Sequence, residues 1–241
     1  MNNQYSNIGI LGYQGFVGSA ITKYCKKKKI NFLGISRKNF DKFKNYRFNY
    51  LINCAMPSKR FWAKKFPYLD FDETVNKTAY FLNDFRFKKF IHISSVSARI
   101  QKNTIYGLNK NRAEKLVKKK NHLIFRLASM YGPGLKKGVI IDLVNSSTVF
   151  VNKKSKYSFT NINKIAEFII TNLSKYKNKT LEIGCGDTLI LEDIRKKINS
   201  NSRFVGDIDN QVLKKSKFNT NFGSSSKIFN FIKKRKKLVI D

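Results

Sequence analysis

Gly12-Tyr13-Gln14-Gly15-Phe16-Val17-Gly18 is the stretch that decides the fold, and it follows the short apolar run NIGIL at residues 7–11. Apolar residues at helical spacing continue over 16–24, so the order predicts a strand, a glycine turn and a helix. Glycines at such a turn let the backbone approach a pyrophosphate, and the N–H groups that start the helix face the anion. Its place after an N-terminal strand favours nucleotide binding over an ordinary glycine-rich turn.

Strand-like and helix-like segments alternate beyond this turn. The sequence predicts strands at 31–36, 50–54, 90–93 and 122–127, with helices at 71–87 and 106–120. Alternation at this interval implies parallel strands, because parallel neighbours need a crossover connection. The predicted fold class is α/β, a doubly wound parallel sheet of the Rossmann type with a small interleaved C-terminal region.

The C-terminal part of the chain is less regular and determines the predicted domain organisation. Its patterns predict helices near 136–145, 161–173 and 189–198, a strand at 180–183 and a polar loop over 200–226. We expect a nucleotide-binding core over 1–135, to which 155–175 return. The segments 136–154 and 176–241 are expected to form the substrate-binding region.

Composition narrows the functional classes. The 241 residues carry 49 Lys and Arg against 15 Asp and Glu, a formal charge of +34, yet 41% are hydrophobic, which excludes a disordered chain. The basic runs are spread along the chain, which favours a solvated surface over a nucleic-acid site. Three separated cysteines and two histidines predict neither a disulfide scaffold nor a metal site. Without a long apolar run or a leader pattern, we expect a soluble cytoplasmic protein with no membrane partner.

Several segments in a fixed order carry a family resemblance. GxxGxxG at 12–18 is followed by Asn53-Cys54-Ala55, by Asn76 in a helix, by FIHISS at 90–95, and by Tyr106 and Lys110 in a YxxxK pattern, then by RLASMYGPG at 126–134 and FTNINKIA at 159–166. Together they resemble the short-chain dehydrogenase/reductase superfamily, in its extended, NAD-dependent epimerase/dehydratase branch. The resemblance covers about residues 1–175.

The resemblance implies a catalytic trio of Ser95, Tyr106 and Lys110. Tyr106 and Lys110 are four residues apart and share a helix face, where the ammonium favours the phenolate. The tyrosine would exchange a proton with a substrate oxygen while hydride moves to or from nicotinamide. By the same resemblance Ser95 would hold that oxygen, and Lys110 would bind the nicotinamide ribose.

The cofactor is expected at the carboxyl ends of the first strands. Besides Tyr106 and Lys110, the expected cofactor-binding residues are Gly12, Gly15, Phe16, Val17, Gly18, Ser36, Arg37, Cys54, Ala55 and Met56. Arg37 stands where an acidic residue would bind the ribose 2′-hydroxyl of NAD, and a guanidinium there accepts a 2′-phosphate. The sequence therefore favours NADP, with NAD as second choice.

Two features depart from the family pattern and leave the substrate open. Only 11 residues separate Ser95 from Tyr106, a short connection for the extended branch, and Arg99 stands where many relatives carry a tyrosine. By resemblance we expect an oxidoreductase that reduces a keto group of a nucleotide-activated sugar, with a nucleotide-sugar epimerase or dehydratase as alternative. A catalytically idle scaffold that binds nucleic acid through its basic surface is the alternative of another class.

Three minor features complete the expectations. The helices at 71–87 and 106–120 form a dimer contact in many relatives, so the resemblance implies a homodimer. LEIGCGD at 181–187 is similar to a methyltransferase motif, but only about 55 residues follow it, too few for that fold. His92 and His122 lie in predicted strands and are expected to pack or hydrogen bond, without a catalytic role.

Overall fold

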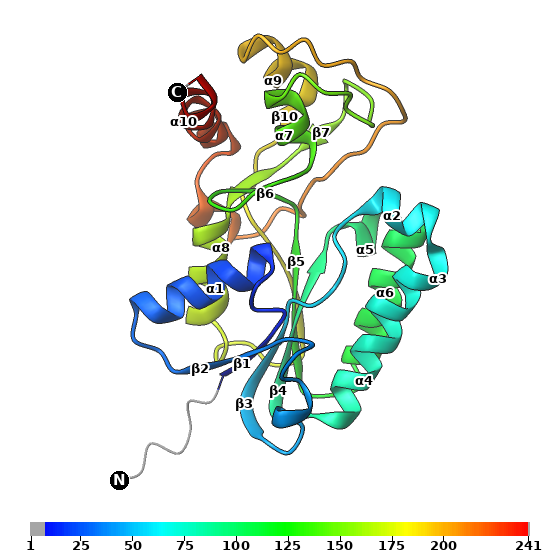
Figure 1. Cartoon of the computed structure of the whole chain (residues 1–241), viewed down its shortest axis with the longest axis vertical. Coiled ribbons are helices and arrows are strands. Elements are labelled where there is room, and N and C mark those ends of the chain that lie inside the picture. Colours follow the sequence, from blue (N-terminus) through cyan, green and yellow to red (C-terminus); the bar gives the residue numbers. More distant parts are fainter. Residues whose placement is uncertain (1–7, 241) are drawn as a thin grey trace. The chain divides into compact units, whose positions relative to one another are not determined.

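The computed structural model describes residues 8–240, with side chains to residue 236, and divides into two compact units (Figure 1). The first unit comprises the residues up to Leu127 together with Ala166–Leu181, and the second comprises Ala128–Ile165 and the residues from Glu182 onward. The expected return segment, 155–175, therefore begins later in the structure. Residues 128–135 leave the first unit because strand β6 (Ser129–Tyr131) pairs with β8 (Phe159–Asn161) in the second.

A six-stranded sheet forms the centre of the first unit. Its order is β2-β1-β3-β4-β5-β9, made by Phe32–Ile35, Ile8–Leu11, Arg47–Asn53, Arg86–Ser95, His122–Leu127 and Lys179–Ile183. The pairs from β2 through β5 are all parallel, which confirms the predicted α/β class. The chain moves from β1 outward to β2 and then to the other side of β1, so the topological switch point lies between β1 and β3.

Helices cover both faces of this sheet (Figure 1). The helix α1 (Phe16–Lys27) and the residues of α8 (Ile162–Thr171) that belong to the first unit lie on one face. The other face carries α4 (Lys77–Asp84) and α6 (Ile105–Val117). Both layers follow from strands that are apolar along their length, because such strands must be covered on two sides.

The connection from β2 to β3 is short. It contains a single 3₁₀ turn, Asp41–Phe43, and no crossover helix. Phe40 stacks on Tyr80 with ring centroids 5.1 Å apart and packs against the core of Phe48, Phe81 and Phe85. These aromatic side chains fill the space that a crossover helix would otherwise cover. This aromatic packing covers the sheet next to the β2–β3 connection.

The helix expected at 71–87 differs most from its prediction. It begins with α3 (Pro67–Phe71), passes through a π-helical turn at Asp72–Asn76, and ends with α4 because β4 already starts at Arg86. Pro67 lies in the first turn of α3, where its missing N–H costs nothing. Two further short helices, α2 (Arg60–Lys65) and α5 (Ser97–Ile100), complete the unit.

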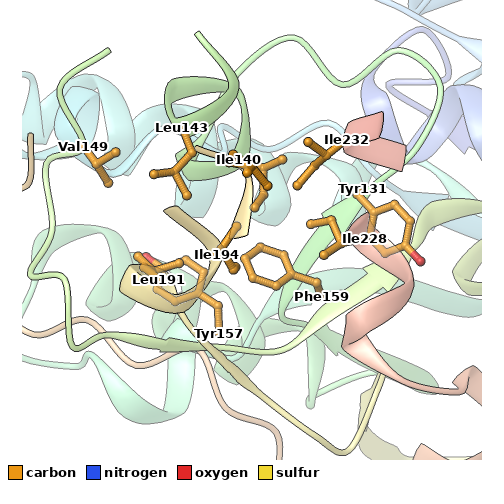
Figure 2. Close-up of a cluster of buried hydrophobic side chains, with 11 residues drawn as sticks. Tyr131, Ile140, Leu143, Val149, Tyr157, Phe159, Leu191, Ile194, Ile228 and Ile232 are labelled. Carbon is orange, nitrogen blue, oxygen red and sulfur yellow. The ribbon is translucent and has the colours of Figure 1, made fainter. Parts of the chain in front are cut away.

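The second unit has its own apolar core (Figure 2). It is built by β6, β8, α7 (Val139–Val144), the two-stranded sheet of β7 (Lys156–Tyr157) with β10 (Leu189–Ile190), α9 (Leu191–Lys197) and α10 (Ile228–Ile240). The sequence did not predict α10, whose basic run at 233–237 is typical of a solvated tail. Ile228 and Ile232, four residues apart, are buried in the core and fix this helix.

The methyltransferase-like motif has a structural role in this unit. Its residues from Gly184 to Asp187 link β9 to β10, and the Asp187 carboxylate accepts hydrogen bonds from the Ser225 N–H at 2.8 Å and the Ser224 hydroxyl at 2.7 Å. These bonds lower the pKa of Asp187 against the opposing effect of burial. The motif therefore closes the turn that precedes α10.

Candidate active site

The glycine turn lies at the switch point between β1 and β3. The Gly12 N–H donates to the Ile35 carbonyl at 2.9 Å, and the Cys54 N–H donates to the Leu11 carbonyl at 3.0 Å. Gly12 has φ +73°, and a Cβ there would lie 2.8 Å from the Cα of Ala55. The turns after β1 and β3 are therefore in backbone contact, and ligands of doubly wound sheets bind in the crevice at such a point.

The start of α1 is left open for an anion. Gly15 caps the helix without a side-chain hydrogen bond, and no acidic residue lies in the first turn, which Phe16 and Val17 begin. Gly18 packs so closely on the turn that a Cβ there would lie 2.3 Å from the Gly12 carbonyl oxygen. The helix N-terminus and its uncapped N–H groups suit a pyrophosphate.

The end of β2 carries the residues expected to distinguish NADP from NAD. The Ser36 N–H and hydroxyl both donate to the Asn39 side-chain oxygen, at 2.7 and 3.2 Å. The Arg37 guanidinium, 81% exposed as a side chain, donates to both carboxylate oxygens of Glu73 at 3.0 Å. Lys77 also pairs with Glu73. A 2′-phosphate at Arg37 would therefore share the guanidinium with Glu73, a partner that the sequence pattern did not indicate.

The turn after β3 is held by Asn53, which is fully buried. Its side-chain oxygen accepts the Ala55 N–H at 3.0 Å. Cys54 is buried enough that its thiol pKa rises to about 12, so it is an apolar lining group and no nucleophile. The Met56 sulfur lies 4.0 Å from the Thr78 hydroxyl of α4. Packing thus fixes the backbone where a nicotinamide ribose would lie.

Ser95, Tyr106 and Lys110 come together at the end of β4. Ser95 is its last residue, its hydroxyl accepts the Ser97 N–H at 3.2 Å, and it acts to lower the pKa of the Tyr106 phenol. Tyr106 is 8% exposed and lies in the first turn of α6. The Lys110 Nζ, one turn further, lies 5.1 Å from the Tyr106 ring centroid and donates to the Pro57 carbonyl at 2.8 Å.

Local packing explains why Tyr106 reaches the serine. Thr104 caps α6 by accepting the Gly107 N–H at 3.1 Å. A Cβ at residue 107 would lie 2.1 Å from the Gln101 carbonyl oxygen and 2.7 Å from that of Ser97. Gly107 therefore lets α6 lie directly on α5, which follows Ser95 in the chain. The short 95–106 connection brings the two residues together without a longer loop.

The electrostatics of the trio suit proton transfer. Burial raises the pKa of Tyr106, against the lowering effects of the Arg60 charge and the Ser95 hydrogen bond. Tyr106 therefore carries its proton at neutral pH. Burial also lowers the pKa of Lys110 to about 7, and the Asp70 carboxylate opposes that shift. The ammonium is thus poised to change charge near neutrality.

Asp70 is a residue of the site that the sequence patterns did not indicate. It is fully buried; one carboxylate oxygen accepts the Asn109 side-chain N–H at 2.9 Å, and the other has no hydrogen-bond partner. Its charge acts on both Lys110 and Tyr106. An acidic residue in a strongly basic chain was the only sequence signal. The packing of α3 on α6 shows that this carboxylate is buried near Lys110 and Tyr106.

Asn76, the helix asparagine named in the resemblance, is a surface residue. It lies on the exposed side of the π-helical turn and donates to the Asp72 carboxylate at 2.6 Å. The buried polar residue of that turn is Thr74, whose hydroxyl has no hydrogen-bond partner.

Both histidines lie in the sheet. His92 is fully buried, 3.5 Å from the Asn53 amide nitrogen, and burial with the nearby charges of Lys110 and His122 lowers its pKa to about 3. His122 contacts the Lys120 carbonyl at 2.8 Å.

Over the described residues, no group of three or more His, Cys, Asp or Glu could hold a metal ion. Within 8–240, no helix combines the length and apolarity needed to cross a bilayer.

A doubly wound sheet with a glycine turn at its switch point, and with Ser95 near the buried Tyr106 and Lys110, defines a dinucleotide-dependent enzyme class. The sequence profile of the NAD dependent epimerase/dehydratase family matches residues 8–184, and the chain belongs to this family. This confirms the resemblance drawn from the motifs. No curated protein matches the sequence.

Solved structures share the fold at low identity. MoeE5 in complex with UDP-glucose and NAD is 14% identical with a TM-score of 0.78, covering 96% of this chain and 99% of that one. The dTDP-4-dehydrorhamnose reductase of Clostridium acetobutylicum is 18% identical with a TM-score of 0.74, covering 95% and 99%. The UDP-glucuronic acid 4-epimerase of Bacillus cereus is 17% identical with a TM-score of 0.73, covering 95% and 99%.

Proposed function

We propose that the chain is an NADPH-dependent reductase that acts on a keto group of a nucleotide-activated sugar. The observation that carries the proposal is that Ser95 ends β4 while the Lys110 Nζ lies 5.1 Å from the Tyr106 ring centroid, in the unit that also holds the glycine turn. Solved relatives of the same fold are described as complexes with UDP-sugars and as a dTDP-sugar reductase, which supports the substrate class.

The residues of the first unit fit a dinucleotide. The open start of α1 would bind the pyrophosphate, and the Lys110 ammonium would exchange its bond to the Pro57 carbonyl for ribose hydroxyls. Arg37 would bind a 2′-phosphate by charge-assisted hydrogen bonds, so NADP is proposed ahead of NAD. The bound cofactor would supply the hydride.

Tyr106 would act as the general acid. In the reducing direction the phenol donates its proton to the substrate oxygen as that oxygen gains an electron pair, and the raised pKa keeps this proton in place beforehand. The Ser95 hydroxyl would hold the same oxygen through a hydrogen bond. The Lys110 ammonium then stabilises the phenolate left behind, which is regenerated by a proton from solvent.

Replacement of Tyr106 by Phe tests the mechanism. We expect the turnover of NADPH with a 4-keto-6-deoxy nucleotide sugar to fall at least about 100-fold, because the proton donor is lost while the ring stays. The dissociation constant of NADPH, measured by fluorescence titration, should change little. Unaltered turnover in this variant would rule out Tyr106 as the acid.

The epimerase and dehydratase alternatives use the same trio, and the assay separates them. A reductase consumes NADPH in proportion to product, whereas an epimerase interconverts two sugars with no net change in absorbance of the nicotinamide. The short connection between Ser95 and Tyr106 favours the reductase, because a less enclosed cavity lets spent cofactor exchange after each turnover. An idle scaffold that binds nucleic acid would instead show no turnover, and its oligonucleotide affinity would fall steeply with added salt.

A further inference from the structure

Residues 57–69, which hold α2 and the first residues of α3 and end before the buried Asp70, expose several apolar side chains. Tyr68 is 86% exposed and Phe61 69% exposed, and Leu69 and Phe66 are exposed as well. Trp62, the single tryptophan of the chain, lies 6.1 Å from Phe66, centroid to centroid. Isolated exposed apolar residues are common, but a run of this kind within thirteen residues marks an interaction surface.

The same segment is strongly basic. Residues 57–69 contain Lys59, Arg60, Lys64 and Lys65 and no acidic residue. The three lysines are exposed, with the Lys59 ammonium 5.8 Å from the Phe61 ring centroid and the Lys65 ammonium 5.4 Å from that of Phe66. Cations therefore border the aromatic side chains, so the partner must offer negative charge together with an apolar phase.

A second copy of the chain fits this surface poorly. A symmetric contact would bring each lysine against the same lysine-rich segment, because a two-fold interface joins identical patches. No carboxylate within 57–69 could neutralise that charge. Like charges without a partner oppose association, so self-pairing through this segment is disfavoured.

Nucleic acid accounts for only part of the surface. Its phosphates would attract the lysines, and its bases could stack on exposed rings. Leu69 has no ring, however, and the one arginine of the segment, Arg60, is half-buried with its charge acting on the Tyr106 phenol. The three outward cations are lysines, which lack the planar fork that makes arginine the better reader of phosphates and bases.

We infer that the segment 57–69 is a docking surface for membranes rich in anionic phospholipids. Phe61, Tyr68 and Leu69 would enter the boundary between headgroups and acyl chains, while Lys59, Lys64 and Lys65 lie against the lipid phosphates. This mode needs no membrane-spanning helix. It places α2, and with it Arg60, between the lipid surface and the candidate active site.

Vesicle binding of the full chain tests the inference without using its activity. Vesicles of phosphatidylcholine and phosphatidylglycerol in equal parts are compared with vesicles of phosphatidylcholine alone, by co-sedimentation and by the emission of Trp62. We expect binding and a blue-shifted emission with the anionic vesicles only. Because the readout is lipid binding, its result does not depend on the proposed reductase activity.

Two matched variants locate the contact. Changing Lys59, Lys64 and Lys65 to Gln should lower the partition coefficient roughly 100-fold, whereas changing Lys26, Lys27 and Lys28 to Gln, an equal loss of exposed charge at the end of α1, should lower it by much less. Changing Phe61, Tyr68 and Leu69 to Ser should abolish the emission shift.

Three results would overturn the inference. They are equal losses of binding in the two lysine variants, equal binding to vesicles of phosphatidylcholine alone, and binding of an RNA oligonucleotide at this segment with no affinity for either vesicle. A change of oligomeric state in the Phe61, Tyr68 and Leu69 variant, with no vesicle binding by the native chain, would assign the surface to a second copy instead. Circular dichroism of each variant verifies that the fold is retained.

Discussion

Replacing Lys110 by Met should change how the stability of the protein depends on pH. Lys110 is 3% exposed, and burial lowers its pKa from 10.5 to about 7 in the folded chain. Between these two values the unfolded chain holds a proton that the folded chain has released, so the free energy of unfolding rises with pH. The methionine variant lacks this contribution at every pH.

The size of the effect follows from the pKa difference. Each pKa unit corresponds to about 1.4 kcal/mol, so between about pH 6 and about pH 9 the native chain should gain about 2.7 kcal/mol relative to the Lys110→Met variant. Below the folded pKa both states are protonated, and the difference between the two proteins should then be independent of pH.

Urea unfolding at the two pH values measures this quantity, with the folded fraction followed by circular dichroism. Lys115→Met is the matched control, because Lys115 is an exposed lysine of the same helix and its removal should shift stability by the same small amount at both pH values. The reasoning is wrong if the difference between native chain and Lys110→Met variant is the same at both pH values. That result would mean that Lys110 keeps its ammonium in contact with water.

Four other changes test the site and its support. Arg37→Asp should weaken NADPH binding at least about tenfold and spare NADH, since it places a carboxylate against the 2′-phosphate; fluorescence titration with both cofactors measures it, and equal losses would show that Arg37 does not read this position. Asp70→Asn should move the alkaline loss of kcat/KM to lower pH, because the carboxylate favours the Lys110 ammonium, whereas Asp72→Asn on the exposed side of the same helical segment should leave the pH profile in place. Glu114→Gln should cost about 3–5 kcal/mol in urea unfolding, because it removes the buried carboxylate that pairs with the half-buried Arg126 guanidinium through Nε at 2.8 Å; a loss under about 1 kcal/mol would contradict this. The expected homodimer through α4 and α6 should appear in sedimentation at micromolar concentration, and Tyr80→Lys, at an exposed position of α4, should shift it to monomer.

The sequence alone determined the class of fold and predicted which residues form the candidate site. Glycines at this spacing after an apolar strand indicate a tight strand-to-helix turn. In the structure Gly12 has a positive φ and Gly18 packs against the turn, and neither position has room for a side chain. Tyr106 and Lys110 share a helix face by periodicity alone. The parallel pairing also followed from the spacing of the predicted strands, because a crossover between parallel neighbours usually contains a helix and separates them by a dozen or more residues.

Tertiary structure decided what those residues touch. The pairing of Arg37 with Glu73, and the burial of Asp70 near Lys110, join residues 36 and 40 positions apart, and no local pattern encodes such contacts. Within the π-helical turn at 72–76, Asn76 lies on the exposed side and Thr74 is buried, and the sequence did not predict this non-α turn. The sequence did not predict α10 because its basic residues are typical of a solvated segment. Ile228 and Ile232 are four residues apart, but only the tertiary structure shows that both pack into the core of the second unit.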